Sequence, residues 1–381
     1  MEPREPELRR VNRGFLDRLL GEVTEWQNRG IITPDQGQAI IAVYPEAELS
    51  QTPRGRLVTV LAILGAVLIG LGIIMFFASN WQELPREAKL ALMLFGVPGT
   101  YVLGFWLRYR KNYQRVGLAV IFLAAIFYGA AIHLVAQSYH VPVNNPNLVS
   151  FWFLGVLPLA YVTRSQAMLF LSVVLFLTAA GFWVQVWLDD LDLIPVKIFP
   201  LYLIFGLMIY GLARLHDQFE WTKPLARVPE ILGVAVAFGS LFLLTFQFWW
   251  DGWFGYFNRS EDVSSSFWLT LFIVTAVTVL AFFGASVIQE RIGLQRATSY
   301  YESAAALVLL VVAYLVILLP IQGDILYPLL LNFLLFLGIL GLIFLGYRRS
   351  DEAVINLALA FFVVDVFSRY FEFGFDLMDR S

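Results

Sequence analysis

The final apolar stretch of the chain contains charged residues at helical spacing. In VVDVFSRYFEF, Asp365 and Arg369 are four residues apart and Glu372 follows at plus seven, so all three fall on one face of a helix. A central Asp or Arg in a membrane span costs about 2.5–3.5 kcal/mol on insertion scales, which makes a functional site the default hypothesis. The alternative is an ion pair within the helix that lowers the cost of insertion.

A second polar stripe occupies an earlier apolar stretch. Ala125, Gly129, His133 and Gln137 recur every four residues, so they share one helical face. The small residues allow another helix to approach closely, and a histidine could shuttle protons near neutral pH. The alternative role is a hydrogen bond between helices, which contributes only about 0.6 kcal/mol on average.

Asn80 is the third candidate, at the polar tip of the first apolar stretch. It is either functional or a helix C-cap in an outer turn. The predicted topology puts all these groups in the outer half of the bilayer. We therefore predict that they line one outward-facing polar cavity, and its candidate residues are Asn80, His133, Gln137, Asp365 and Arg369.

The sequence lacks the signatures of soluble enzymes. There is no G-x-x-x-x-G-K-[ST], no H-E-x-x-H and no G-x-S-x-G. The chain has no cysteine and only three histidines, which excludes thiolate sites and disfavours a histidine metal site. We predict no catalytic residues, no cofactor and no metal. An intramembrane enzyme would need paired carboxylates, for which only Asp365 and Glu372 are candidates.

The composition is that of a polytopic membrane protein. Of 381 residues, 59% are hydrophobic and 14% are charged, against about 25% charged in soluble domains. The net charge of −3 implies no nucleic-acid partner, and the long apolar runs imply the lipid bilayer as the surroundings. The first 50 residues are polar, so we expect the first span to act as an uncleaved insertion signal.

Residues 1–56 are predicted to form a short cytosolic helical hairpin and a linker. Apolar residues recur at helical spacing over 7–28, and Arg29-Gly30 ends that helix. Thr33 is the expected N-cap of a second helix that has Pro34 at its first position and runs to about Tyr44. The hairpin either packs on the inner membrane face or binds a protein partner through residues 1–50.

Residues 57–381 are predicted to form an all-α transmembrane bundle of eleven spans. In the first, Ala62, Ala66 and Gly70 offer a close-packing face. The fourth is short and, we expect, interrupted by Pro158. The predicted spans are 57–79, 88–107, 116–136, 148–163, 167–187, 196–213, 229–249, 267–286, 303–319, 326–346 and 353–371.

The orientation follows from the Lys and Arg residues in the loops. With the N-terminus inside, all but six of the 26 fall on the inner side. The six exceptions are Arg86, Lys89, Lys197, Arg259, Arg369 and Arg380. We therefore predict a multi-pass inner-membrane protein with a cytoplasmic N-terminus and, because the number of spans is odd, an outer C-terminus.

Several segments together resemble one family. They are Trp26 with Gly30-Ile31-Ile32, then Phe77-Ala78-Ser79-Asn80-Trp81 before Leu84-Pro85, and Gly129 to His140. With these motifs, residues 8–145 resemble DUF2157, a domain-of-unknown-function family of predicted bacterial membrane proteins. The last span, with Asn356 and Ser368 to Phe371, is similar to the tail of the same proteins. The resemblance implies an integral membrane protein and no assigned activity.

Two functions remain open from these features. The spans and their polar residues favour a permease-like or channel-like protein for a small polar solute or ion. The alternative is a non-transport envelope scaffold or sensor, whose cytosolic hairpin binds a partner.

Overall fold

A computed structural model describes most of the chain. The described residues are 13–42, the isolated positions 68, 72, 75, 79, 85 and 87, and then 91–188, 194–246, 264–292, 296–318 and 326–379. Contacts divide the chain into two units, Met1–Lys89 and Leu90–Ser381.

The first unit contains the predicted hairpin, with α1 (Arg13–Asn28) and α2 (Pro34–Ala42). Gly30 has a φ of +69°, a value that glycine tolerates, and it ends the first helix. Thr33 Oγ1 accepts from Gln36 N (3.3 Å), and Thr33 N donates to Gln36 Oε1 (2.9 Å). This reciprocal capping box confirms the predicted N-cap and start of the second helix. Val23 is buried between the two helices.

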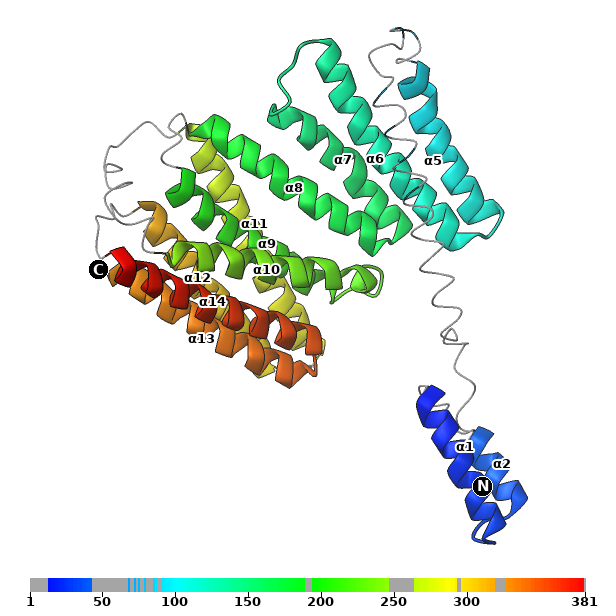
Figure 1. The fold of residues 1–381 in the computed structure, drawn as a ribbon. Helices are drawn as coiled ribbons and strands as arrows, with labels where there is room; N and C mark the ends of the chain where they lie inside the picture. Colours follow the sequence, from blue (N-terminus) through cyan, green and yellow to red (C-terminus); the bar gives the residue numbers. More distant parts are fainter. Residues whose placement is uncertain are drawn as a thin grey trace. The chain divides into compact units, whose positions relative to one another are not determined.

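All the described secondary-structure elements of the second unit are helices (Figure 1). Its elements are η1 (Leu92–Gly96), α5 (Val97–Phe105), η2 (Trp106–Arg110), α6 (Gln114–Ser138), α7 (Pro146–Thr163), α8 (Gln166–Trp187), α9 (Ile194–His216), η4 (Lys223–Leu225), α10 (Arg227–Leu244), α11 (Ser265–Ile292), α12 (Arg296–Leu318), α13 (Leu326–Arg349) and α14 (Glu352–Asp379).

Among the described residues, nine helical segments are long and apolar enough to cross a membrane. They are α6 to α14, and they match the last nine predicted spans in order, which confirms an all-α polytopic bundle. The predicted span 88–107 falls on the run η1–α5–η2, in which two five-residue π-helical segments flank the α-helix. Most of the predicted span 57–79 lies outside the described residues.

The expected interruption at Pro158 is wrong. Helix α7 continues through Pro158 and begins at Pro146, where the Asn145 side chain accepts from Asn147 N (3.0 Å). An internal proline removes one backbone hydrogen bond, but membrane helices tolerate it because local adjustments and neighbouring groups satisfy the freed carbonyl.

The helices of the second unit pack in two groups. Helices α5 to α8 pack as a sequential series, and α9 and α10 form the centre of the group that continues to α14. Glycines hold α9 and α10 close together. A Cβ on Gly206 would lie 2.4 Å from Ala237 N, and one on Gly233 would lie 2.5 Å from Tyr210 N. The backbones therefore touch where larger side chains would separate them.

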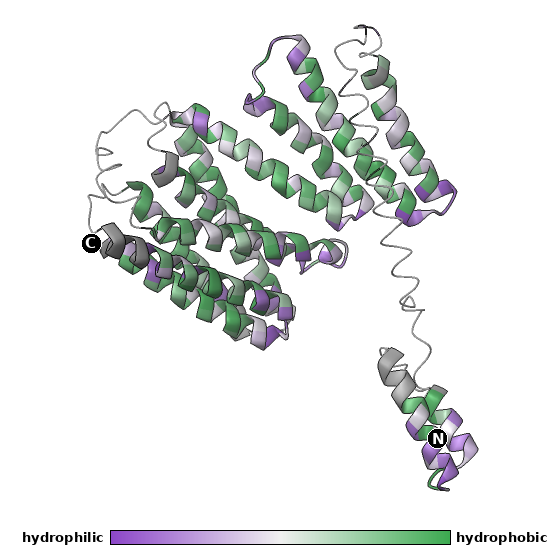
Figure 2. Ribbon diagram, in the orientation of Figure 1, coloured by the Kyte–Doolittle hydropathy of each residue, from purple (hydrophilic) through white to green (hydrophobic). Residues whose placement is uncertain are grey.

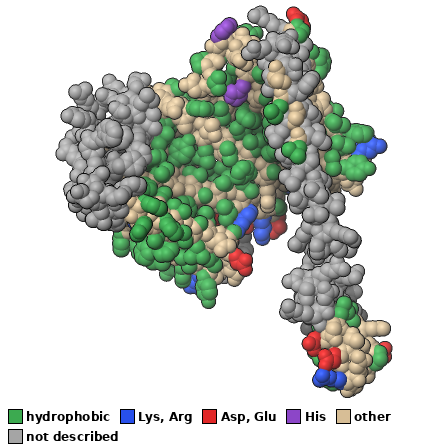
Figure 3. All heavy atoms as spheres, in the orientation of Figure 1, with side chains coloured by type: hydrophobic (Ala, Val, Ile, Leu, Met, Phe, Trp, Pro, Cys, Tyr) green, Lys and Arg blue, Asp and Glu red, His purple; other side chains and the backbone are tan. Residues whose placement is uncertain are grey.

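The surface of the second unit carries many apolar side chains. Figure 2 shows hydrophobic residues along the lengths of the helices and hydrophilic residues at several turns, and Figure 3 shows broad hydrophobic areas on one face. On α11, Phe272, Leu280 and Phe283 are each about 70% exposed. Soluble monomers rarely expose apolar surface so extensively, whereas lipid-facing helices do so routinely.

Candidate functional site: charged residues at the helix ends

Two hydrogen bonds connect the helix ends that carry predicted inner-side cations. Arg108 Nη2, in η2, donates to Thr163 O at the end of α7 (2.8 Å). Gln166 Nε2, in the first turn of α8, donates to Pro224 O in η4 (2.8 Å). The turns around 108–111, 163–166 and 216–227 therefore lie at one end of the second unit, which we call the basic end.

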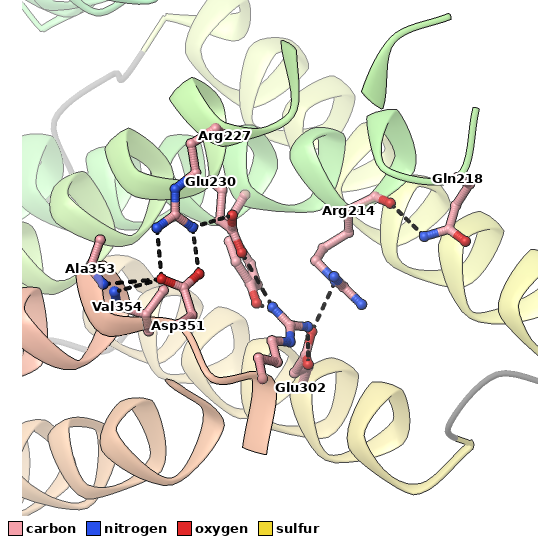
Figure 4. Close-up of polar contacts among 10 residues, drawn as sticks. Arg214, Gln218, Arg227, Glu230, Glu302, Asp351, Ala353 and Val354 are labelled. Atoms are coloured by element: carbon pink, nitrogen blue, oxygen red, sulfur yellow. Dashed lines mark hydrogen bonds and ion pairs between the residues drawn. The ribbon is translucent and has the colours of Figure 1, made fainter. Parts of the chain in front are cut away.

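The most enclosed acid at the basic end is Glu302, at the start of α12. Its side chain is 8% exposed and pairs with Arg214 Nε of α9 (3.0 Å) and with Arg349 Nη2 of α13. The hydroxyl of Tyr210 donates to the same carboxylate (3.2 Å). Figure 4 shows Arg214 and Glu302 directed toward each other from separate helices. A buried carboxylate requires such partners, because desolvation of an isolated charge is very unfavourable.

A second acid, Glu230 in the first turn of α10, extends this set of contacts. Its Oε2 accepts from Arg227 Nη1 (2.9 Å), and its Oε1 accepts from Arg349 Nη1 (3.3 Å). Arg349 therefore bridges Glu230 and Glu302, which joins α10, α12 and α13.

Asp351 completes the arrangement in the turn between α13 and α14. Arg227 binds it through two parallel hydrogen bonds, Nη1–Oδ2 at 2.5 Å and Nη2–Oδ1 at 2.7 Å. Its Oδ1 also accepts from Ala353 N (3.1 Å) and Val354 N (3.3 Å), so it caps the start of α14. The hydrogen bonds from Arg227 lower the pKa of Asp351, because they favour its ionised form.

These residues form one balanced group. Three cations meet three anions, and each anion contacts at least one cation. Arg349 contacts two anions, as does Arg227, whose contacts with Glu230 and Asp351 are drawn in Figure 4. Arg227 and Arg349 can therefore each release one acid and keep the other, whereas Arg214 and Asp351 each have one charged partner in the group. We call it the six-residue charge cluster: Arg214, Arg227, Glu230, Glu302, Arg349 and Asp351.

This cluster was not predicted from the sequence. Arg214, Arg227 and Arg349 were expected only as cations of the inner loops, and neither Glu230 nor Glu302 was a predicted site residue. A signal was present, because Glu230 lies inside the predicted span 229–249 and Glu302 lies one residue before the span 303–319. An acid at the end of an apolar span requires a partner when that end is buried.

The charged residues of the last span form a second polar group, at the opposite end of α14. Arg369 pairs with Glu372 and, more loosely, with Asp365 (Nε–Oδ1, 3.4 Å). It also donates to Thr245 O (3.3 Å) and to Thr245 Oγ1. The intrahelical pair is therefore present, and the arginine also binds a carbonyl at the C-terminus of α10, where a positive charge is favourable.

Two further contacts strengthen this second group. The Arg369 guanidinium lies 4.7 Å from the ring centroid of Phe246. Asn332 Nδ2, near the start of α13, donates to Pro328 O (2.8 Å) and to Thr245 O (3.3 Å). Thr245 thus connects α10, α13 and α14 away from the basic end.

His133 lies in a different environment, between α6 and α7. Its Nδ1 is 2.9 Å from Gly129 O, and its ring packs edge-on against Trp152 at 6.1 Å between centroids. Trp152 Nε1 donates to Ala125 O (2.9 Å), so the tryptophan covers the small-residue part of the predicted stripe. Gln137, one turn further along α6, is exposed.

The candidate cavity residues therefore have separate neighbours where the structure describes them. Helix α6, with His133, packs on α5, η2 and α7, whereas α14, with Asp365 and Arg369, packs on α13 and α10. Asn80 lies outside the described residues. A shared outward-facing cavity stays a prediction.

Comparisons with known proteins find similarity to one protein family. Neither the comparison with curated proteins nor that with solved structures finds a significant match. One family model matches residues 24–169, which extend from α1 into the start of α8. The six-residue charge cluster and the last span fall outside that match, whereas His133 and Gln137 fall within it. The match confirms, over residues 24–169, the resemblance to DUF2157, a family of predicted membrane proteins.

Proposed function

We propose that this membrane protein is a permease-like protein for a small polar solute or ion, and that the six-residue charge cluster gates its basic end. The observation that carries this proposal is the bridging position of Arg349 between Glu230 and Glu302. An arginine that contacts two acids from two helices can release one while it keeps the other. Movement of α13 against α10 or α12 would then not isolate a buried charge.

We propose further that the basic end faces the cytoplasm of a bacterial cell. Cytoplasmic loops carry an excess of Lys and Arg, and the turns at this end together with the six-residue charge cluster carry most of the predicted inner cations of the second unit. With both predicted spans 57–79 and 88–107 crossing the bilayer, the N-terminal hairpin would also be cytoplasmic. Because α14 begins at the basic end, its C-terminal end would lie on the outer side.

Flux measurements test the transport proposal. Full-length protein is reconstituted into proteoliposomes, and K⁺, Na⁺ and proton fluxes are compared for the wild type, Glu302→Gln and Glu352→Gln. Glu302 lies inside the cluster, whereas Glu352 is exposed at the start of α14. We expect Glu302→Gln to change the flux at least severalfold and Glu352→Gln to leave it unchanged.

Two results would contradict these proposals. Folded wild-type protein that passes none of these ions, and no member of a panel of small polar solutes, would contradict the transport proposal. Equal fluxes for the wild type and Glu302→Gln would contradict the role of the cluster as a gate and leave transport itself intact.

The second candidate function is a scaffold or sensor that binds a protein partner through the hairpin. It is favoured by the self-contained contacts of α1 and α2, which lie in a separate unit with a capping box at Thr33. In the hairpin, Ile31 is 64% exposed and is available for contact. Deletion of residues 1–50 tests this function. A truncated protein that inserts normally into the membrane but no longer replaces the full-length protein in cells supports this function. A truncated protein that replaces it fully contradicts this function.

A further inference from the structure

A groove of about 580 Å³ lies between α12 and α13. Helix α12 packs on α9 and α11, and α13 packs on α10 and α14, so the floor of the groove comes from α9 and α10. The floor includes Leu207, Val234 and Phe238. The lining is almost entirely apolar along the helices.

The groove opens toward the surface that faces lipid. Val308 of α12 and Leu337 and Phe344 of α13 line it, and each is about half exposed. Gly341 hollows the wall on α13, because a Cβ added there would meet no heavy atom within 4 Å. A groove of this kind in a bilayer is accessible to the acyl chains of the surrounding lipids.

One end of the groove carries a positive charge at the basic end. Glu302 lines it but is already paired with Arg214 and Arg349. Arg348 also lines it, is exposed, and has no carboxylate partner among the described residues. Its guanidinium lies 5.3 Å from the ring centroid of Phe344, and Tyr301, at the same end, is 68% exposed.

We infer that this groove binds one anionic phospholipid, with an acyl chain between α12 and α13 and the phosphate at Arg348. Lipid tails are as apolar as the groove, so the chain gains dispersion contacts but little hydrophobic free energy. Selectivity must therefore come from the headgroup, and basic pockets between membrane helices suit anionic headgroups. The site is independent of the proposed permease function.

Charge favours a lipid over a second copy of the chain as the occupant. A second copy would have to supply a carboxylate or a carbonyl to Arg348, whereas an anionic lipid has its phosphate at the depth where Arg348 and Tyr301 end the apolar groove. The continuity of the groove with the lipid-facing surface provides the route of entry.

Native mass spectrometry of the delipidated full-length protein tests the site. Phosphatidylglycerol and phosphatidylcholine are titrated separately, and bound lipids are counted. We expect one phosphatidylglycerol to bind more tightly than phosphatidylcholine. Arg348→Gln should reduce that preference about fivefold, the ratio that corresponds to about 1 kcal/mol for one basic residue near the headgroups. Arg110→Gln, which removes an exposed cation from η2 at the same end, should leave the preference unchanged.

A second pair of variants tests the position of the acyl chain. Gly341→Leu fills the groove without a clash at Cβ and should weaken the binding of both lipids severalfold. Gly239→Leu adds the same side chain to α10, also without a contact at Cβ, but away from the groove lining, and should change neither affinity. Thermal unfolding of each variant checks that it is folded.

Three outcomes would overturn the inference. The first is an unchanged lipid preference in Arg348→Gln. The second is unchanged lipid binding in Gly341→Leu, including the case in which that variant instead dissociates a dimer, because another chain would then cover the groove. The third is displacement of phosphatidylglycerol by inorganic phosphate alone, because the acyl chain would then contribute nothing to binding.

Discussion

Arg227 and Asp351 hold the start of α10 against the turn that precedes α14 through two parallel hydrogen bonds of 2.5 and 2.7 Å. The residues are 124 positions apart, so the pair fixes a long-range contact. Planar guanidinium and carboxylate groups match each other in this geometry, which a lysine at position 227 could not reproduce. Asp351 in addition caps α14.

The first prediction concerns the pH dependence of this pair. Because Arg227 lowers the pKa of Asp351, the pair stabilises the folded state above the ordinary pKa of an aspartate, about 3.9. That stability is lost as the pH falls through the lower pKa of the folded state. Thermal unfolding of the detergent-solubilised chain, followed from pH 7 to pH 3, should show Asp351→Asn less stable at pH 7 and the difference narrowing toward pH 3.

The matched control is Asp217→Asn, which changes an exposed aspartate just after α9. It should run parallel to the wild type at every pH. If the difference in thermal stability between Asp351→Asn and the wild type stayed constant down to pH 3, the predicted lowering of the Asp351 pKa by Arg227 would be contradicted.

The second prediction concerns the acid that joins three helices. Glu302→Gln removes the charge that Arg214 and Arg349 share, and loss of one partner from a buried ion pair costs about 3–5 kcal/mol. We expect a loss of this size in the free energy of unfolding, measured by denaturant titration in mixed micelles. Glu352→Gln should change it by less than about 0.5 kcal/mol, as is usual for exposed positions.

Arg349→Gln combined with Glu302→Gln extends this test. The double variant should be less destabilised than the sum of the two single variants, because each single change already breaks their shared contact. Strict additivity would mean that the two side chains do not interact in the folded protein.

The third prediction concerns the close contact between α9 and α10. Gly206→Ala puts a methyl group 2.4 Å from Ala237 N, so a helix backbone must shift, and overpacking of this kind costs about 1–3 kcal/mol. Gly239→Ala, on α10, meets nothing within 4 Å and should be neutral or stabilising by up to about 1 kcal/mol. Unfolding midpoints in detergent distinguish the two, and equal midpoints would contradict the close packing.

The sequence predicted the helices better than it predicted their polar contacts. The apolar runs predicted the positions of α6 to α14, because the thickness of a bilayer sets the length of a span directly. Thr33 and Pro34 predicted the start of α2, because a capping box is local in sequence. The predicted interruption at Pro158 was wrong because the effect of an internal proline depends on the surroundings of the helix and not on the residue alone.

The six-residue charge cluster required tertiary information. The pairs Arg214–Glu302 and Arg227–Asp351 join residues far apart in the chain, and no spacing within one helix reveals them. In the last span, by contrast, the i,i+4 spacing of Asp365 and Arg369 indicated their contact. The role of Thr245 at the end of α10 was not foreseen, because a backbone carbonyl leaves no signal in the sequence.

The fourth prediction tests the shared outer cavity. His133 contacts Gly129 and Trp152, and Asp365 contacts Arg369, so the two side chains have no described partner in common. We expect His133→Ala and Asp365→Ala to be additive in the double variant within about 0.5 kcal/mol of unfolding free energy. A coupling above 1 kcal/mol would instead support a common cavity.

The charge cluster also bears on the order of events during biogenesis. In the proposed orientation, Arg214, Arg227 and Arg349 retain their loops in the cytoplasm while the spans enter the bilayer, when acidic residues contribute little to topology. Once the helices assemble, Glu230, Glu302 and Asp351 neutralise the same three arginines. In that orientation each arginine would act twice, first as a signal that sets topology and later as an ion-pair partner between assembled helices.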